Sequence, residues 1–274
     1  MKPEQPGNNK QNDYSEISPL HLWRGAGGEV DINCDMGEGI GNDAAIMPFI
    51  SSANIACGYH AGDEDTMKRT VELCLKNNVV IGAHPSFFDK ENFGRKEMKL
   101  PVEKIYDLVL TQIEILDKIA QSQGTRLYHV KPHGALYNMS ARDIDIAKTI
   151  AKSVKYFNAQ LILFGLSNSY SISEAKAIGL KTASEVFADR TYQDDGSLTP
   201  RSQPRALIEN TDKSVHQVLQ MIKNKTITTV TGKTFPIVAE TICIHGDGKY
   251  AVEFAKQIHE ALTKEGINIQ PASQ

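Results

Sequence analysis

Six short apolar runs in this chain each end in a side chain that can transfer a proton, bind an anion or ligate a metal. The residues at or just after these ends are Asp35, His60, His84, Lys131 with His133, Glu185 with Asp189 and Arg190, and His245 with Asp247. In a parallel α/β fold the carboxyl ends of all strands lie on one face of the sheet. We therefore expect these side chains, although far apart in the sequence, to meet in one pocket and form an active site.

Four of these residues are histidines, which with Asp35 could transfer protons or bind a divalent metal. A single histidine at a strand end is usually a hydrogen-bonded structural residue, but four in equivalent positions favour a shared pocket. No two of these four histidines are placed by their spacing on one face of a single helix or strand. The sequence therefore leaves the metal ligands unknown and predicts no tightly bound metal.

Three cationic residues are candidates for binding an anion. Lys131 ends an apolar run and is followed by Pro132, which favours an ammonium aimed into the pocket over a solvated one. Arg95 lies in the long loop after His84, where it could clamp a carboxylate or be solvated. Arg190 belongs to a charged group for which a surface charge run is the default interpretation, but the start of that group at a strand end also indicates a role in the site.

Two glycine-containing segments resemble nucleotide-binding loops without satisfying their patterns. The first loop, residues 35–42, has Asn42 where a dinucleotide-binding turn needs glycine or alanine. The segment 232–234 ends like a phosphate-binding loop, but Ile227 stands where the first glycine is required. Neither predicts a nucleotide site, although the first loop could still bring backbone N–H groups close to an anion.

The elements that position these residues follow a strand, loop, helix rhythm from residue 29 onward. Besides the runs above, we expect helices near 67–75, 102–119, 142–157, 168–178, 204–223 and 249–265, and strands near 160–164, 181–186 and 238–244. Residues 227–236 predict a small appended β-hairpin that turns near Gly232. About seven parallel strands favour a barrel or near-barrel over an open sheet.

Composition is compatible with one domain over residues 29–274, preceded by an extension, residues 1–28, that we expect to be disordered or draped on the surface. The 274 residues carry a net charge of −3, which gives no electrostatic reason to expect nucleic acid or an anionic membrane as partner. The four cysteines form no C-x-x-C pair, and no apolar run is long enough to cross a membrane. We expect a cytoplasmic protein that acts on a small molecule.

Six longer motifs, in order along the chain, resemble the LamB/YcsF family of 5-oxoprolinase A subunits. They cover residues 31–39, 53–63, 82–87, 130–138, 185–190 and 244–247. The resemblance implies a distorted β/α barrel, TIM-like and related to the glycoside hydrolase and deacetylase barrels. It also implies ATP-dependent opening of 5-oxoproline to L-glutamate together with partner subunits B and C, with ATP and Mg²⁺ bound with or by those partners.

Opening the unreactive lactam amide in this way requires a base, cations for carboxylate and phosphate, and a proton donor for the ring nitrogen. The resemblance makes Asp35 or Glu185 the base, and His60, His84, His133 or His245 the proton donor. Lys131, Arg95 and Arg190 are the anion clamps, and Asn33, Glu38, Asn54, Asp189 and Asp247 are further candidates for binding the substrate. The sequence does not decide which residue takes which role.

Two other functions are compatible with these residues. One is a metal-dependent hydrolase, such as a carbohydrate deacetylase, with Asp35, His60 and His84 as ligands. The other is a non-catalytic subunit that binds substrate for catalytic partners. Elemental analysis separates the first of these from a 5-oxoprolinase, and the activity of the chain with and without partners separates the second.

Overall fold

The computed structural model describes residues 28–246 and 250–273. Within these residues seven parallel strands form a closed barrel, since the last strand of the series pairs with the first. The strands are, in order around the barrel, β1 (Glu29–Met36), β2 (Ser52–Ala56), β3 (Val80–His84), β4 (His129–Val130), β5 (Ile162–Leu166), β6 (Lys181–Phe187) and β9 (Thr241–Ile244). The expected distorted TIM-like barrel is thereby confirmed, whereas the extension expected over residues 1–28 lies almost wholly outside the described residues.

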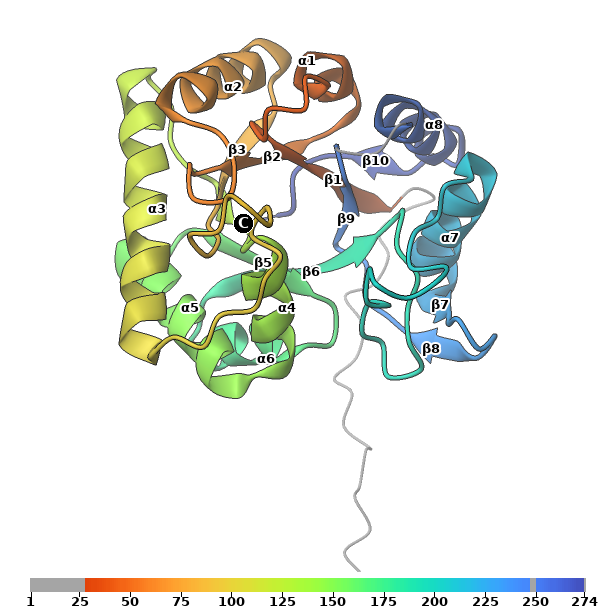
Figure 1. Cartoon of the computed structure of the whole chain (residues 1–274). Coiled ribbons are helices and arrows are strands. Elements are labelled where there is room, and N and C mark those ends of the chain that lie inside the picture. Colours follow the sequence, from red (N-terminus) through yellow and green to blue (C-terminus); the bar gives the residue numbers. More distant parts are fainter. Residues whose placement is uncertain (1–27, 247–249, 274) are drawn as a thin grey trace, which may run out of the picture.

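Helices surround the barrel on its outside (Figure 1). They are α1 (Asp43–Ile46) with the 3-10 turn η1 (Met47–Phe49), α2 (Glu64–Asn77), α3 (Val102–Ser122), α4 (Gly134–Arg142), α5 (Ile144–Phe157), α6 (Tyr170–Ala177), α7 (Thr211–Asn224) and α8 (Ala251–Lys264). In α3, Ile105, Val109 and Ile113 recur on one face and are buried against the barrel. No helix among the described residues has the length and apolar character needed to span a membrane.

Three short strands complete the fold. The strand β10 (Asn268–Ile269) pairs in parallel with the first residues of β1. The strands β7 (Thr226–Thr228) and β8 (Thr234–Pro236) form an antiparallel hairpin, which lies beside α7 at the periphery (Figure 1). Gly232 has a φ of +86° in its turn, a conformation that glycine adopts without strain. The predicted hairpin is confirmed.

Two helix boundaries differ from those expected. The helix expected from residue 204 begins at Thr211, because the side chain of Asn210 accepts a hydrogen bond from the backbone N–H of Lys213 and caps α7 there. The preceding segment, residues 191–208, forms an irregular loop instead. The helix expected from residue 142 is preceded by a separate helix, α4, and Asp143 lies between the two as the N-cap of α5.

The interior of the barrel is polar, although TIM barrels usually fill this space with branched aliphatic side chains. Asp31, Asn33 and Asp35 alternate along β1 and make hydrogen bonds to side chains of other strands inside the barrel. The intervening Ile32 and Cys34 belong to the main apolar core. The main apolar layer therefore lies between strands and helices, and the side of β1 that faces the barrel interior carries polar groups.

Gly82 on β3 makes room for the imidazole of His129 inside the barrel. A Cβ at residue 82 would lie 2.1 Å from Nε2 of His129. The ring of His129 stacks on Phe164 with centroids 4.1 Å apart, so it has no space in which to retreat. His129 is held in place because its Nε2 bonds the side-chain oxygen of Asn54 at 2.7 Å.

We predict that Gly82→Ala lowers the free energy of unfolding by about 1–3 kcal/mol, because the added methyl overpacks a buried ring. Urea denaturation measures the change. His129→Ala removes the ring, so it should cost less stability in the Gly82→Ala background than in the parent chain. Equal costs in the two backgrounds would show that the methyl group does not clash with this ring.

Candidate functional site

A cavity of about 760 Å³ opens at the carboxyl ends of the barrel strands. Its charged and titratable lining includes Asp35, His84, Arg95, Glu97, Lys131, His133, Arg142, Arg190, Asp195, Arg201 and His245. Seven of these are residues that the sequence singled out, from five different strand ends and the loop after β3. A concave site with several convergent polar groups is the usual form of a small-molecule site.

Lys131 is at the centre of the polar groups below the cavity. Its ammonium donates to Oδ1 of Asp35 at 2.9 Å and lies 2.8 Å from Oε1 of Glu185. It also lies 3.1 Å from Oδ1 of Asn33 and 3.0 Å from Sγ of Cys243. The side chain is only 3% exposed, so these contacts replace water around the charge.

The charges around Lys131 keep both it and Asp35 ionised. Burial alone would lower the pKa of Lys131, but the surrounding acidic groups, with Asp35 the strongest, hold it well above its usual value. Burial would likewise raise the pKa of Asp35, yet the nearby His84 and the ammonium of Lys131 outweigh it and hold that pKa well below its usual value. Asp35 therefore presents a carboxylate, and not a carboxylic acid, to the cavity.

Three of the candidate residues lie beneath the cavity and not in its lining. Asn33 donates through Nδ2 to Oε1 of Glu185 at 2.9 Å, and Asn54 donates to Oδ1 of Asp35, also at 2.9 Å. All three side chains are fully buried. Asn33, Asn54 and Glu185 therefore lie where they orient Lys131 and Asp35. Lys131 and Asp35 themselves line the cavity.

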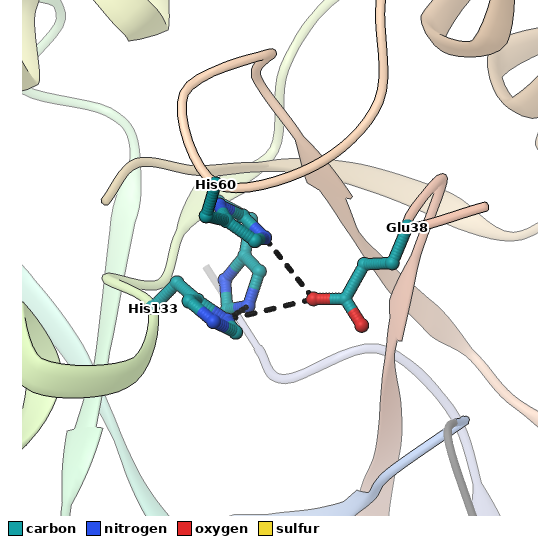
Figure 2. A group of neighbouring side chains, drawn as sticks. Glu38, His60 and His133 are labelled. Carbon is teal, nitrogen blue, oxygen red and sulfur yellow. Dashed lines mark hydrogen bonds and ion pairs between the residues drawn. The ribbon is translucent and has the colours of Figure 1, made fainter. Parts of the chain in front are cut away.

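Three histidines form a compact cluster with Glu38 beside Asp35, and Figure 2 shows His60 and His133 facing the Glu38 carboxylate. Oε1 of Glu38 lies 3.1 Å from Nε2 of His60 and 3.5 Å from Nδ1 of His133. The rings of His60 and His133 are stacked, with centroids 3.8 Å apart. Nε2 of His84 is 2.8 Å from Nδ1 of His133 and 3.3 Å from Oδ2 of Asp35.

The loop after β3 covers this cluster. Gly94 has a φ of +66°, and a Cβ there would lie 2.9 Å from both His60 and His133. Its carbonyl accepts a hydrogen bond from the N–H of Ala135 at 2.9 Å, which joins the loop to the start of α4. Gly94 is not among the site residues predicted from the sequence. The sequence feature that could have indicated it is its position directly before Arg95, because a glycine lets the backbone approach other groups closely.

His245 and Asp189 form a separate pair at the edge of the cavity. Oδ2 of Asp189 lies 2.8 Å from Nδ1 of His245, and the imidazole stacks on the ring of Phe187. Burial would raise the pKa of Asp189, but the charge of His245 and their hydrogen bond hold it below its usual value. Asp189 is thus placed to orient His245, which itself lines the cavity and can exchange a proton there.

Four arginines contribute to the cavity wall. Arg95 is exposed and lies against the ring of Phe93, whereas Arg190 is buried and donates to the carbonyls of Thr199 and Ala206. Burial lowers the pKa of Arg190 to about 10. Arg142 and Arg201 were not predicted from the sequence: Arg142 ends the unexpected helix α4, and Arg201 lies in the irregular loop that precedes α7. Asp247 lies outside the described residues.

Comparison with known proteins agrees with this geometry. Residues 30–274 match the model of the LamB/YcsF family. The 5-oxoprolinase A subunit of Oceanobacillus iheyensis is 52% identical over 88% of this chain and 96% of that protein, and the A subunit of Bordetella pertussis is 50% identical over 89% and 98%. The crystal structure of the lactam utilization protein from Thermus thermophilus superposes with a TM-score of 0.83 at 38% identity, covering 89% of this chain and 100% of that one. The chain belongs to the LamB/YcsF family.

Proposed function

We propose that this chain is the A subunit of an ATP-dependent 5-oxoprolinase, which hydrolyses 5-oxo-L-proline to L-glutamate. The observation that carries the proposal is the cavity itself, in which the ionised carboxylate of Asp35 faces a wall containing Lys131 and four arginines. Such a cavity suits a small anionic substrate that must be attacked by water. The relatives are named as 5-oxoprolinase A subunits and a lactam utilization protein, which supports the same substrate class.

The chemistry explains why ATP is consumed. A lactam carbonyl resists water, but transfer of the γ-phosphoryl group of ATP to its oxygen gives ADP and an activated carbon. Water adds to that carbon, the ring C–N bond breaks as the nitrogen takes a proton, and a second water hydrolyses the remaining acyl phosphate. The products are glutamate, ADP and phosphate, and the protein must position water, stabilise anionic oxygens and supply one proton.

The residues of the cavity can divide these tasks among themselves. Asp35 is in the ionised state needed to accept a hydrogen bond from the attacking water, and Lys131 beside it is a fixed positive charge for the developing oxyanion. His245, oriented by Asp189, is the proposed proton donor to the ring nitrogen. Arg95 and Arg201, both exposed at the cavity wall, are the proposed partners of the substrate carboxylate and the phosphate.

The nucleotide is proposed to bind as ATP with Mg²⁺, with or on partner subunits B and C. The two glycine-containing segments of this chain depart from the nucleotide-binding patterns they resemble, so neither supplies a known loop for ATP. The relatives are named as A subunits, which implies a complex. A metal-dependent hydrolase is the second candidate function, and the cluster of His60, His84 and His133 favours it, but that activity would need neither ATP nor partners.

We predict that the purified chain alone releases little or no glutamate from 5-oxoproline with ATP and Mg²⁺, and that addition of subunits B and C restores turnover. The reason is that the chemistry needs a nucleotide site, which we assign to the partners. A coupled assay for glutamate and ADP measures both products together. Robust turnover by the isolated chain would rule out the proposed division of labour, and glutamate release without ADP would favour the metal-dependent hydrolase.

We predict that Asp35→Asn lowers kcat of the reconstituted enzyme by about 10²–10⁴, roughly 3–5 kcal/mol of transition-state stabilisation, because the amide cannot accept a proton from water. Lys131→Met should lower kcat/KM by a similar factor, since it removes the charge next to the reacting oxygen. Steady-state kinetics, with circular dichroism to verify folding, measures both.

Lys118→Met is the matched control for these two variants, because Lys118 is exposed on α3, outside the cavity lining. It loses the same charge as Lys131→Met and should leave the kinetics unchanged. If folded, assembled Asp35→Asn and Lys131→Met enzymes turn over within about twofold of the parent, these strand ends are not the active site.

A further inference from the structure

The cluster of Glu38, His60, His84 and His133 takes no part in the proposed reaction, yet it brings four potential ligand atoms within 4.8 Å of one another. Three of the four residues are buried, and the fourth, Glu38, is largely so. What the cluster can bind depends on which ring nitrogens carry hydrogen. In each ring one nitrogen points into the cluster and the other, the outer nitrogen, points away from it. The hydrogen-bond partner of the outer nitrogen determines where the hydrogen lies.

The outer nitrogen of His84 must carry a hydrogen. Nδ1 of His84 lies 2.7 Å from the backbone carbonyl of Lys131, and a carbonyl can only accept a hydrogen bond. A neutral imidazole has one N–H, so Nε2 of His84 presents a lone pair to the cluster.

In His133 the two nitrogens exchange roles relative to His84, but a lone pair again points into the cluster. Its Nε2 lies 2.9 Å from the carbonyl of Phe93 and must donate to it, which leaves Nδ1 with a lone pair. This Nδ1 is the atom that lies 2.8 Å from Nε2 of His84. In the neutral state, two lone pairs therefore face each other at hydrogen-bond distance without a hydrogen between them.

His60 is the third ring that directs a lone pair into the cluster. The hydroxyl of Ser86 donates to the carbonyl of Phe87 at 3.0 Å, so it accepts from Nδ1 of His60, which lies 2.8 Å away. Nε2 of His60 then presents its lone pair to Oε1 of Glu38, 3.1 Å away. All three rings are thus oriented so that acceptor atoms alone point into the cluster.

We propose that this cluster is a binding site for one divalent transition-metal ion, with zinc as the best fit, ligated by Nε2 of His60, Nε2 of His84, Nδ1 of His133 and Oε1 of Glu38. A cation among four convergent acceptors removes their mutual repulsion. Ligands about 2.0–2.1 Å from zinc in a tetrahedral site lie roughly 3.3 Å apart, and the contacts of 2.8, 3.1 and 3.5 Å within the cluster bracket that spacing.

The outer hydrogen bonds match those of known metal sites, where a ligating histidine donates its other N–H to a carbonyl, a carboxylate or another fixed acceptor. Here the acceptors are the carbonyls of Lys131 and Phe93 and the hydroxyl of Ser86. Three imidazoles and one carboxylate suit zinc and neighbouring transition metals better than Mg²⁺ or Ca²⁺, which prefer oxygen ligands.

A second group with metal-ligand spacing, Asp35, Cys243 and His245, is less suitable. The ammonium of Lys131 already lies 2.9 Å from Asp35 and 3.0 Å from Cys243, so a cation there would be repelled. Asp35 instead links the two regions, because its Oδ2 is 3.3 Å from Nε2 of His84. The proposed ion would lie in the wall of the cavity, which His84 and His133 line.

This proposal differs from the sequence-based expectation of no tightly bound metal. One ligand lies at the end of β3 and the others lie in the segments after β1, β2 and β4, so no spacing within a single element could indicate them. The proposal does not rest on the 5-oxoprolinase assignment, because its test measures metal content and not turnover.

The experiment uses the full chain, purified without a histidine tag and stripped with a chelator, then incubated with zinc chloride and passed through a desalting column. We expect about one zinc per chain by elemental analysis, and a rise in melting temperature when zinc is added to the stripped protein. His216→Ala is the control, since it removes an exposed histidine on α7 and should leave the stoichiometry unchanged.

The decisive variants preserve the outer hydrogen bonds. In His60→Asn the amide nitrogen takes the place of Nδ1 and can still donate to Ser86, while in His133→Gln it takes the place of Nε2 and can still donate to Phe93. Each removes one ligand and should abolish retention of zinc on the column. Ser86→Ala keeps all four ligands but removes the acceptor for His60, so zinc affinity should fall about 10–100-fold.

Two results would overturn the proposal. One is a zinc content well below one per chain, with no change in melting temperature. That result would mean that added protons on the histidines, and not a metal ion, separate the facing lone pairs. The other is stoichiometric zinc that is retained equally by the folded His60→Asn and His133→Gln variants, which would place the metal elsewhere.

Discussion

The buried ammonium of Lys131 is the constraint on which the rest of the site depends. A charge that is removed from water requires opposite charges and hydrogen-bond acceptors at close range, and here Asp35 and Glu185 supply the charges while Asn33 supplies an amide oxygen. These partners come from β1 and β6, whereas Lys131 follows β4, so the ammonium links three strands that are not neighbours in the barrel. The polar groups inside this barrel follow from that requirement, and the main apolar core lies in the layer between strands and helices.

Asp35 connects this charge to the histidine cluster, because its two oxygens face different partners. Oδ1 accepts from Lys131 and Asn54, whereas Oδ2 lies near His84. A carboxylate held from both sides has a fixed orientation and a low pKa, which suits a group that must orient water or stabilise a neighbouring positive charge. A cation in the cluster would add to this effect, so Asp35 is the contact between the proposed reaction and the proposed metal site.

Much of this arrangement could be predicted from the sequence, because strand order and strand-end chemistry are local signals. The barrel, the hairpin at Gly232 and the convergence of Asp35, Lys131 and His245 follow from periodicity and from the common direction of parallel strands. Other features depend on contacts between distant segments. Arg201 lines the cavity from the irregular loop before α7, which no local pattern predicts, and the hydrogens on the three histidine rings are determined by acceptors such as the carbonyl of Phe93.

A double-mutant cycle on Lys131 and Glu185 tests most directly whether the buried ion pair organises the site. Lys131→Met alone should lower the free energy of unfolding by about 3–5 kcal/mol, because it leaves carboxylates buried without their partner. Adding Glu185→Gln should then cost less than it does in the parent, with a coupling energy above about 1 kcal/mol in urea denaturation. Additive effects, within about 0.5 kcal/mol, would show that the two side chains do not interact and would contradict the account.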